Sequence, residues 1–438
     1  MIVREHALLT TRPSAESSID QARIALATFE WLIELSTEWS RSLRTVYDQG
    51  HPAIKLGSLV GYICSPAGEQ IEILPKTESG CENTSESRDV MRRILQSSIA
   101  PKQYQANDAL LMKDDSPIHE WIFSQYLEEL QSLVTHGLKF NYLEIEEQQA
   151  FLRGRLNVSA QVQQRPGSEH LFHIRHEIFT PDRLENRLLK TALNFVHSYC
   201  ATSDNWRLSN TLMQQLDEIP VETAPVPRLK QWSSSRLMQS YNAIKPWCEL
   251  ILMQFNPNFQ RGSHRGIALL FPMELLFESY VANLLRGQVV PGWRLRSQAK
   301  SKYLIENHKS KALFNLRPDL LLESKSAVQV LDTKWKILDS NNSGENYGLK
   351  QSDFYQLFAY AHKYQKGKGD MMLIYPANNK FDRPLPAFQY QEDLFVWVVP
   401  FCLKTQKLKE GEWCGRFASL NPSDICCEPQ SPLRALDA

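Results

Sequence analysis

The chain has 438 residues, of which 42% are hydrophobic and 10% aromatic, so it can form two or three domains with hydrophobic cores. Its 49 basic and 49 acidic residues cancel to a formal net charge of zero, which excludes a protein that attracts nucleic acid through its overall charge. No run approaches the roughly 18 apolar residues of a membrane span, and the N-terminus has no apolar core of signal-peptide length, so we expect no membrane partner.

The first part of the chain is predicted to change from helix to strand. A helical period runs through residues 20–45, and the period then shifts toward two. Residues 57–64 and 69–76 flank a Ser-Pro-Ala-Gly turn and are typical of a β-hairpin. The polar stretch 77–88 is predicted to be a loop, with a helix after it.

The middle of the chain is predicted to be mainly helical. Residues 118–137 carry an apolar face at helical spacing and end on a glycine. Short strand-like pieces follow at 140–145 and 151–158. Further helices are expected on both sides of the proline-rich stretch 220–227, including one over 233–253.

These elements divide the chain into three expected parts. Residues 1–165 form a β-hairpin and helical region, 166–262 a helical connecting region, and 263–438 a C-terminal domain. The last boundary is placed near Gly262 because residues 261–266 (Arg-Gly-Ser-His-Arg-Gly) are small and polar.

The C-terminal domain has the order helix, strand, strand, strand, helix, strand, which predicts a mixed α/β fold with a sheet flanked by helices. Its first helix begins at Pro272 and runs to Leu285. Glu278 lies beside the buried stripe of this helix, where it could point at a sheet edge, and Glu274, one turn earlier, is the alternative. Taken alone, either glutamate is more typical of a solvated helix surface.

Two apolar runs in this domain carry the residues with the clearest chemical meaning. Residues 316–323 contain a Pro-Asp pair ending at Asp319, and residues 328–336 contain the triplet Asp332-Thr333-Lys334. A short serine-containing turn separates the runs, so they are predicted to pair as a hairpin. Side chains alternate along a strand, so Asp332 and Lys334 point to one face, and Asp319 can converge on the same edge.

A converging pair of carboxylates is explained by a cation between them. Like charges disfavour joint ionisation of Asp319 and Asp332, and oxygen ligands suit Mg²⁺ or a similar hard ion. Such an ion polarises a scissile phosphate and lowers the pKa of bound water, while Lys334 could orient that water or neutralise charge on the phosphate oxygens. An Asp-x-Lys triplet is common by itself. Its spacing after the Pro-Asp pair and a Glu-bearing helix indicates phosphodiester hydrolysis.

A helix over residues 352–364 adds further candidates. Asp353 and Gln356 share one of its faces, so Gln356 could reach the metal site. Asp353 is more simply interpreted as an N-cap. Tyr355 and Phe358 are expected to pack into the core.

A local excess of positive charge lies in residues 293–317. Only Glu306 is acidic there, and a solvated hairpin surface is the simpler interpretation of this stretch, with a nucleic-acid patch as the alternative. The basic residues are Arg294, Arg296, Lys300, Lys302, Lys309, Lys311 and Arg317.

Taken in order, several segments resemble the McrC family, the nuclease subunit of McrBC-type restriction systems, within the wider PD-(D/E)xK class of restriction-endonuclease-like domains. The segments are Gly68–Lys76, Leu152–Leu156, Asp182–Arg187, Leu276–Val281, Arg317–Asp319, Leu331–Lys334 and Asp353–Tyr360. The resemblance implies that Asp319, Asp332 and Lys334 are catalytic. Glu278 and Gln356 are then supporting active-site residues, and Glu278 joins the two aspartates as a ligand of Mg²⁺.

The same resemblance implies a partner. In this family the N-terminal part binds a ring of the GTP-hydrolysing AAA+ motor McrB and stimulates its hydrolysis, a role that we transfer to residues 1–165 as a region. The chain has no G-x-x-x-x-G-K-[ST] phosphate loop, so GTP must be bound by the partner. The resemblance thus implies a Mg²⁺-dependent endonuclease subunit that cuts modified double-stranded DNA in phage defence.

Two other functions stay open. One is a non-catalytic activator of the motor that keeps the nuclease fold, against which the intact Asp319, Asp332 and Lys334 argue. The other is a stand-alone DNA repair nuclease, against which the long N-terminal region without a DNA-binding motif counts. The eight cysteines form no C-x-x-C pair and no zinc pattern, so we expect reduced thiols and a cytoplasmic location.

Overall fold

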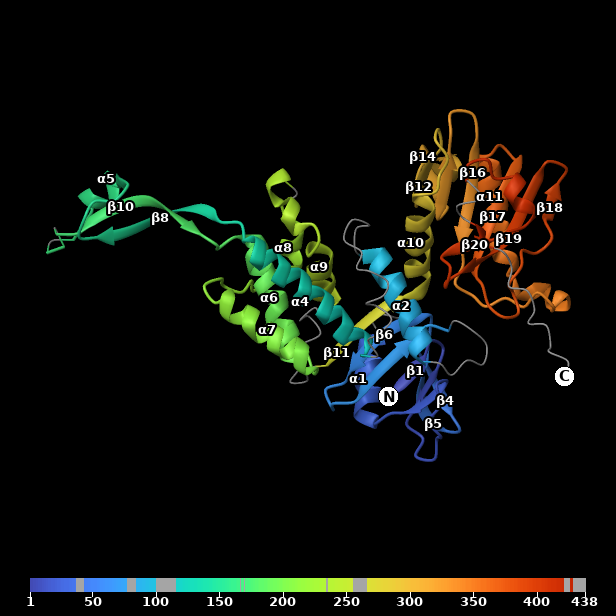
Figure 1. Ribbon diagram of the computed structural model, residues 1–438, viewed down its shortest axis with the longest axis horizontal. Coiled ribbons are helices and arrows are strands. Elements are labelled where there is room, and N and C mark those ends of the chain that lie inside the picture. Colours follow the sequence, from blue (N-terminus) through green and yellow to red (C-terminus); the bar gives the residue numbers. More distant parts are fainter. Residues whose placement is uncertain are drawn as a thin grey trace, which may run out of the picture. The chain divides into compact units, whose positions relative to one another are not determined.

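The computed structural model describes residues 1–36, 43–76, 84–99, 116–165, 167–168, 170–233, 235–254, 266–420 and 426–427. The chain forms two compact units, one from residues 1–115 and 262–438 and one from residues 116–261. We call them the discontinuous unit and the inserted unit. The discontinuous unit thus combines the two ends of the chain, which are blue and orange to red in Figure 1.

This division differs from the three parts expected from the sequence. The expected boundary after residue 165 falls inside the inserted unit, between α5 (Val158–Val162) and β10 (Phe172–Thr180). The reason is that β8 (Asn141–Gln149) pairs with β10 along its full length, which ties both sides of that boundary together. The boundary expected at Gly262 lies outside the described residues, although the two units divide at this point of the sequence.

Two small sheets form the N-terminal part of the discontinuous unit. Their strands are β1 (Ile2–Arg4), β2 (Leu8–Thr10), β3 (Gln21–Arg23), β4 (Leu43–Asp48), β5 (His51–Leu56), β6 (Leu59–Cys64), β7 (Gln70–Leu74) and β11 (Ile267–Pro272). The orders are β1-β7-β6-β11 and β3-β2-β5-β4. The predicted hairpin is confirmed as β6 and β7, and β11, which follows the insertion in sequence, pairs antiparallel with β6.

A close backbone approach at Gly61 explains why a glycine stands in β6. Its φ is +140°, and a Cβ atom built there would lie 1.9 Å from the carbonyl oxygen of Leu269 in β11. Any side chain would push these two strands apart. The glycine therefore permits the pairing that joins the two ends of the discontinuous unit.

Two helices of this unit differ in their bounds from the sequence-based prediction. The helix predicted over 20–45 is α1 (Leu26–Ser36), which begins only after β3. The stretch 77–88 is not all loop, because α2 (Thr84–Ile99) already begins at Thr84, and residues 77–83 lie outside the described residues. Arg88 of α2 is buried and paired with Glu72 of β7 at 2.7 Å, so this polar segment packs instead of being solvated.

The large sheet of the discontinuous unit confirms the predicted mixed α/β fold. Its described strands are ordered β12-β15-β16-β17-β19-β20-β21, with β18 beside β19. They are β12 (Arg294–Ser297), β15 (Leu320–Glu323), β16 (Val328–Thr333), β17 (Gly369–Pro376), β18 (Phe388–Gln391), β19 (Leu394–Cys402), β20 (Lys407–Lys409) and β21 (Cys426–Cys427). β15 and β16 are antiparallel, whereas β16, β17 and β19 are parallel.

Helices connect and flank this sheet. α10 (Met273–Arg286) precedes β12, and α11 (Gln351–Tyr364) makes the crossover that the parallel pair β16 and β17 requires. Short 3₁₀ turns lie at Ser343–Gly348 and Glu412–Gly415. The core includes fully buried residues from the strands and from α11, namely Leu321, Val330, Leu357, Met371, Leu373 and Val398.

Between β12 and β15 the chain forms a separate two-stranded hairpin. Its strands are β13 (Lys302–His308) and β14 (Lys311–Leu316), which pair antiparallel and with no other described strand. Every residue of β13 is exposed.

The inserted unit consists of helices and a long hairpin. Its helices are α4 (Ile118–His136), α5 (Val158–Val162), α6 (Leu184–Tyr199), α7 (Ser203–Gln215), α8 (Pro225–Leu229), a 3₁₀ turn (Arg236–Tyr241) and α9 (Lys245–Gln254). α4 confirms the helix predicted over 118–137, whereas the single helix predicted over 233–253 is divided in two. The hairpin, which we call the arm, spans 141–180 and contains β8, β9 (Arg155–Leu156), α5 and β10 (Figure 1). None of the helices described in either unit is both long enough and apolar enough to cross a membrane.

Candidate active site

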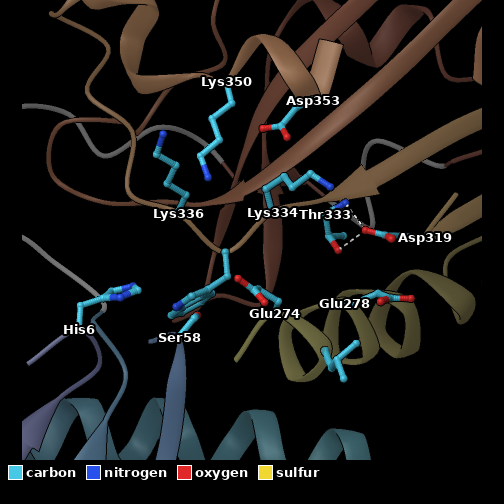
Figure 2. A pocket seen from close by; sticks show the side chains of 12 residues that line it. His6, Ser58, Glu274, Glu278, Asp319, Thr333, Lys334, Lys336, Lys350 and Asp353 are labelled. Carbon is cyan, nitrogen blue, oxygen red and sulfur yellow. Dashed lines mark hydrogen bonds between the residues drawn. The ribbon is translucent and has the colours of Figure 1, made fainter. Parts of the chain in front are cut away.

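The pairing of β15 with β16 brings the two predicted aspartates to one end of the large sheet. Leu320 lies opposite Leu331, so Asp319, just before β15, lies beside the last residue of β16, Thr333. Asp319 Oδ2 accepts hydrogen bonds from the backbone nitrogen and the hydroxyl of Thr333, both at 2.8 Å (Figure 2). Asp332, the preceding residue, is 1% exposed.

Lys334 completes the predicted triplet. Its backbone nitrogen donates to the carbonyl of Ile374, which continues the pairing with β17, and its Nζ lies 2.5 Å from Asp332 Oδ2. Burial lowers the pKa of Lys334, but the charges of Asp332 and Asp319 outweigh this effect and raise it above its ordinary value. Lys334 is therefore a cation at neutral pH, which suits it to neutralise phosphate charge.

The two aspartates resist ionisation. Burial, and next the charge of Asp319, raises the pKa of Asp332 to about 7, although Lys334 opposes this shift. Burial also raises the pKa of Asp319, against the opposing effects of Lys334 and the two hydrogen bonds from Thr333. A second cation near the pair would favour the ionised state of both carboxyls.

Glu278 of α10 faces the same region. Its side chain is buried, and Gln298 Nε2 donates a hydrogen bond to its Oε2 at 3.5 Å. Burial, and next the charge of Asp319, raises the pKa of Glu278 to about 7. Glu278 is thus electrostatically part of the site, whereas Glu274 is exposed one turn earlier on the same helix.

Gln356 is connected through Tyr360 to the backbone before Asp319. It is exposed, and its Nε2 donates to the hydroxyl of Tyr360 at 2.6 Å. The Tyr360 hydroxyl in turn donates to the carbonyl of Arg317 at 2.9 Å, two residues before Asp319. Gln356 does not line the pocket described next, and this relay connects it to the backbone just before Asp319.

A pocket of about 540 Å³ opens beside these residues, and its lining contains residues that the sequence did not single out (Figure 2). Asp353 lines it from the first turn of α11, where Lys350 and not Asp353 is the N-cap. Burial, and next the charge of Lys350, lowers the pKa of Lys336 in the pocket wall. The lining is completed from both ends of the chain by His6, Ser58, Glu274, Leu275, Glu278, Asp319, Thr333, Lys334 and Trp335.

A buried hydrogen bond explains how N-terminal residues reach the pocket. Glu5 is 1% exposed and accepts a hydrogen bond from Trp335 Nε1 at 2.6 Å. It also accepts from Lys76 N at 2.8 Å and Ser58 Oγ at 3.1 Å. Because Trp335 follows Lys334 directly, Glu5 holds the segment that carries the catalytic candidate. No local signal in the sequence joins residues so far apart.

The donors present fit a hard divalent cation that takes few protein ligands. Asp332 Oδ1 is buried and has no hydrogen-bond partner among the described residues, and carboxylates of Asp319 and Glu278 line the adjoining pocket. Mg²⁺ commonly uses one or two carboxylates and keeps several waters. In the part of the chain that the structure describes, however, no three acidic, histidine or cysteine side chains come close enough to bind one ion together. The structure therefore associates two aspartates and does not draw Glu278 into one ligand group with them.

The sequence matches the family described as McrBC 5-methylcytosine restriction system component over residues 54–376, which is well over half of the chain. The chain belongs to this McrBC family. The matched region includes every predicted site residue, from Glu278 to Gln356. No curated protein matches the chain.

Two solved structures contain similar chains. One is the half-complex from a tetradecameric assembly of Thermococcus gammatolerans McrB AAA+ hexamers with bound McrC, with 17% identity, a TM-score of 0.66, and coverage of 92% of this chain and 94% of the other. The other is the Thermococcus gammatolerans McrBC complex, with 20% identity, a TM-score of 0.48, and coverage of 69% and 89%. The first similarity shows a shared fold over nearly the whole chain, and the second is too weak to add to it.

Proposed function

We propose that this protein is the metal-dependent DNA endonuclease subunit of an McrBC-type restriction complex. The supporting observation is the meeting of Asp319, Asp332 and Lys334 at the end of β16, beside an open pocket. The family membership supports the restriction context. The McrB hexamers in the complex of the similar chain support an AAA+ GTPase ring as the partner, which would bind GTP in place of this chain.

The site residues have distinct parts in the proposed hydrolysis. Asp319 and Asp332 would hold Mg²⁺, which supplies a polarised phosphate and a bound water of lowered pKa. Lys334 is protonated and would neutralise negative charge on the phosphate oxygens. Lys336 and Lys350 in the pocket wall would attract the DNA backbone. The charge of Asp319 contributes to the raised pKa of Glu278, and Glu278 would ionise when a cation binds nearby.

Contact with the motor is proposed for the arm, which includes the end of the region 1–165 and continues to Thr180. Most residues of β8 are exposed. Phe179 stacks on Phe140 at 4.8 Å and lies tilted against Tyr142 at 5.0 Å, and it is 62% exposed. Further large apolar side chains, including Phe151 and Leu152, are exposed toward its tip. Exposed apolar surface of this kind marks protein-binding sites. With β8 about 30 Å long, the arm could reach along the axis of a ring.

A non-catalytic activator of the motor is the second candidate. The observation that favours it is the lack, among the described residues, of three acidic, histidine or cysteine side chains that could share a metal ion. The two candidates differ in one property, which is cleavage in the presence of the motor.

The test compares Asp332→Ala with wild type in a cleavage assay on modified and unmodified DNA, with the partner ring, GTP and Mg²⁺. We expect the cleavage rate of the variant to fall at least about 100-fold. Loss of a residue that only supports a metal ligand typically costs about 10–100-fold in activity, and loss of the ligand itself should cost more. Stimulation of the partner's GTPase should be unchanged. Asp393→Ala, at an exposed aspartate of the same unit, is the matched control.

The outcomes separate the candidates. Equal cleavage by Asp332→Ala and wild type would exclude this site. GTPase stimulation without any cleavage by the wild type would establish the activator in place of the nuclease. Cleavage by the wild type without a motor would favour a stand-alone enzyme.

A further inference from the structure

The hairpin of β13 and β14 is a cationic projection. Its only carboxylate, Glu306, is already bound by Lys363 of α11, with 2.9 Å between Nζ and Oε1. Within the part of the chain that the structure describes, no carboxylate lies within ion-pair distance of the exposed basic residues of the hairpin. These are Lys300, Lys302, Lys309, Lys311 and Arg317.

The turn at the tip of the hairpin contains a lysine in a backbone conformation that disfavours it. Lys309 and Ser310 form the turn with φ of 48° and 64°. Two-residue hairpin turns with positive φ at both positions favour asparagine and glycine. The Asn307 side chain supports the turn by accepting a hydrogen bond from Ser310 N at 3.0 Å. Lys309 thus lies exposed at a turn position that asparagine or glycine would occupy with less backbone strain.

A strained aromatic residue lies on the same hairpin. Phe314 has a φ of 58°, which is rare for a bulky residue, and its side chain is 67% exposed. Packing in a hydrophobic core therefore does not explain why a phenylalanine occupies this strained position. Exposed apolar side chains of this kind enter DNA grooves and press against base steps in many complexes.

The base of the hairpin is fixed beside the candidate active site. Tyr364 of α11 donates from its hydroxyl to the carbonyls of Leu316 at 3.1 Å and Ala299 at 3.4 Å. Tyr360 holds the carbonyl of Arg317 in the same way, and Asp319 follows two residues later. With seven residues in β13, the tip extends about 20 Å from this anchored base.

We propose that the hairpin of β13 and β14 holds double-stranded DNA next to the active site, with Lys309 and Lys311 on backbone phosphates and Phe314 in a groove. This inference rests on the proposed nuclease function and names the element that positions its substrate. DNA carries one negative charge per about 1.7 Å of duplex, so it is a partner of opposite charge for these lysines. A solvated hairpin surface would not need a strained phenylalanine that is 67% exposed.

The test measures binding of the full chain to a fluorescent DNA duplex by anisotropy, in EDTA, so that no cleavage is required. Affinity is followed from about 50 to 200 mM salt, where each neutralised phosphate contributes about 0.9 to the slope of log K against log salt. K309Q/K311Q should reduce the slope by roughly 1.8 if each lysine contacts one phosphate. F314A should lower affinity at every salt concentration and leave the slope unchanged.

Two variants serve as controls. K325Q/K366Q removes the same charge from two exposed lysines elsewhere in the discontinuous unit and should keep the wild-type slope. K309R/K311R keeps the charge and should keep the slope as well.

Each other result overturns the inference in an identifiable way. An unchanged slope for K309Q/K311Q, or an equal change for K325Q/K366Q, excludes the hairpin while leaving the nuclease proposal intact. A change of molecular mass in light scattering, with DNA binding retained, assigns the surface to a second copy of the chain. Failure of the wild type to bind any duplex in EDTA overturns the hairpin inference alone, whereas binding without cleavage in the assay with the motor, GTP and Mg²⁺ overturns only the nuclease.

Discussion

At the residue scale, protonation of Glu278 makes the free energy of unfolding depend on pH. Burial, and next the charge of Asp319, raises its pKa from 4.5 to about 7. Between these values the folded protein holds a proton that the unfolded chain has lost. The free energy of unfolding therefore falls as pH rises through this window, and the loss is complete above about pH 7.

Glu278→Gln should remove this dependence, because glutamine does not titrate. We expect its melting temperature to exceed that of the wild type by more at pH 8 than at pH 5, by on the order of 2 °C, in EDTA. Differential scanning fluorimetry across pH measures this difference. Glu274→Gln, at the exposed glutamate one turn earlier, should follow the wild type at every pH. A difference between Glu278→Gln and wild type that is constant with pH would contradict the assignment.

At the element scale, the segment after β16 is held by contacts that come from elsewhere in the chain. Trp335 donates to buried Glu5 and its ring lies 5.2 Å from Phe277, centroid to centroid, next to Glu278 in α10. One tryptophan thus connects the β16 end to both the N-terminal sheet region and α10. The position of Lys334 depends on this connection because it is the preceding residue.

Trp335→Phe should keep an aromatic ring at this position and remove the indole N–H donor. Glu5 then loses one of its hydrogen bonds inside the protein, and we expect a loss of about 1–3 kcal/mol in the free energy of unfolding of the discontinuous unit. The cleavage rate should fall as well, while affinity for DNA in EDTA is retained. Urea unfolding and single-turnover cleavage measure the two effects. Trp206→Phe, at a half-exposed tryptophan of the inserted unit, is the control; unchanged cleavage by Trp335→Phe would limit the residue to a structural role.

α11 shows how far helix periodicity could predict this site. The helix was expected over 352–364 and spans Gln351–Tyr364. The expectation that Tyr355 and Phe358 pack into the core is wrong, because they are 66% and 37% exposed. The buried face carries Leu357, Tyr360 and Ala361 instead. Periodicity located the helix, but hydrophobicity alone did not identify the face that meets the sheet.

At the whole-molecule scale, the chain consists of a discontinuous unit with the candidate site and an inserted unit with the arm. Asn186 in α6 donates from its side-chain nitrogen to the carbonyls of Lys139 and Pro181, at 3.0 and 2.7 Å. These two residues flank the arm, so its two ends are held together by the helical part of the inserted unit. The arm can therefore be removed without opening that part.

Replacing the arm, residues 141–180, with a short Gly-Ser linker should leave a folded chain that no longer stimulates the GTPase of the partner ring. Cleavage that depends on the motor should be lost with it, whereas duplex binding in EDTA should match the wild type. Circular dichroism, GTPase assays and anisotropy measure the three properties. Asp332→Ala, which should stimulate the GTPase normally, is the complementary control. Full stimulation by the armless chain would place the motor contact elsewhere in the protein.

The sequence alone determined those helices and hairpins whose formation depends on residues close together in the chain. The hairpin of β6 and β7, the helix α4, and the pairing of β15 with β16 follow from alternation, turn residues and apolar spacing. Because a short turn sets the strand register, the spacing from Asp319 to Asp332 sufficed to bring them together.

Only the tertiary structure decided what depends on residues far apart in the chain. It pairs β11 with β6 across the insertion, places Glu5 under Trp335, and brings Lys350 into the pocket wall. It also connects Gln356 through the Tyr360 hydroxyl to the carbonyl of Arg317. Such contacts arise when whole helices and strands pack together. They produce no repeating residue pattern in either of the two segments, so neither segment predicts the contact from its own sequence.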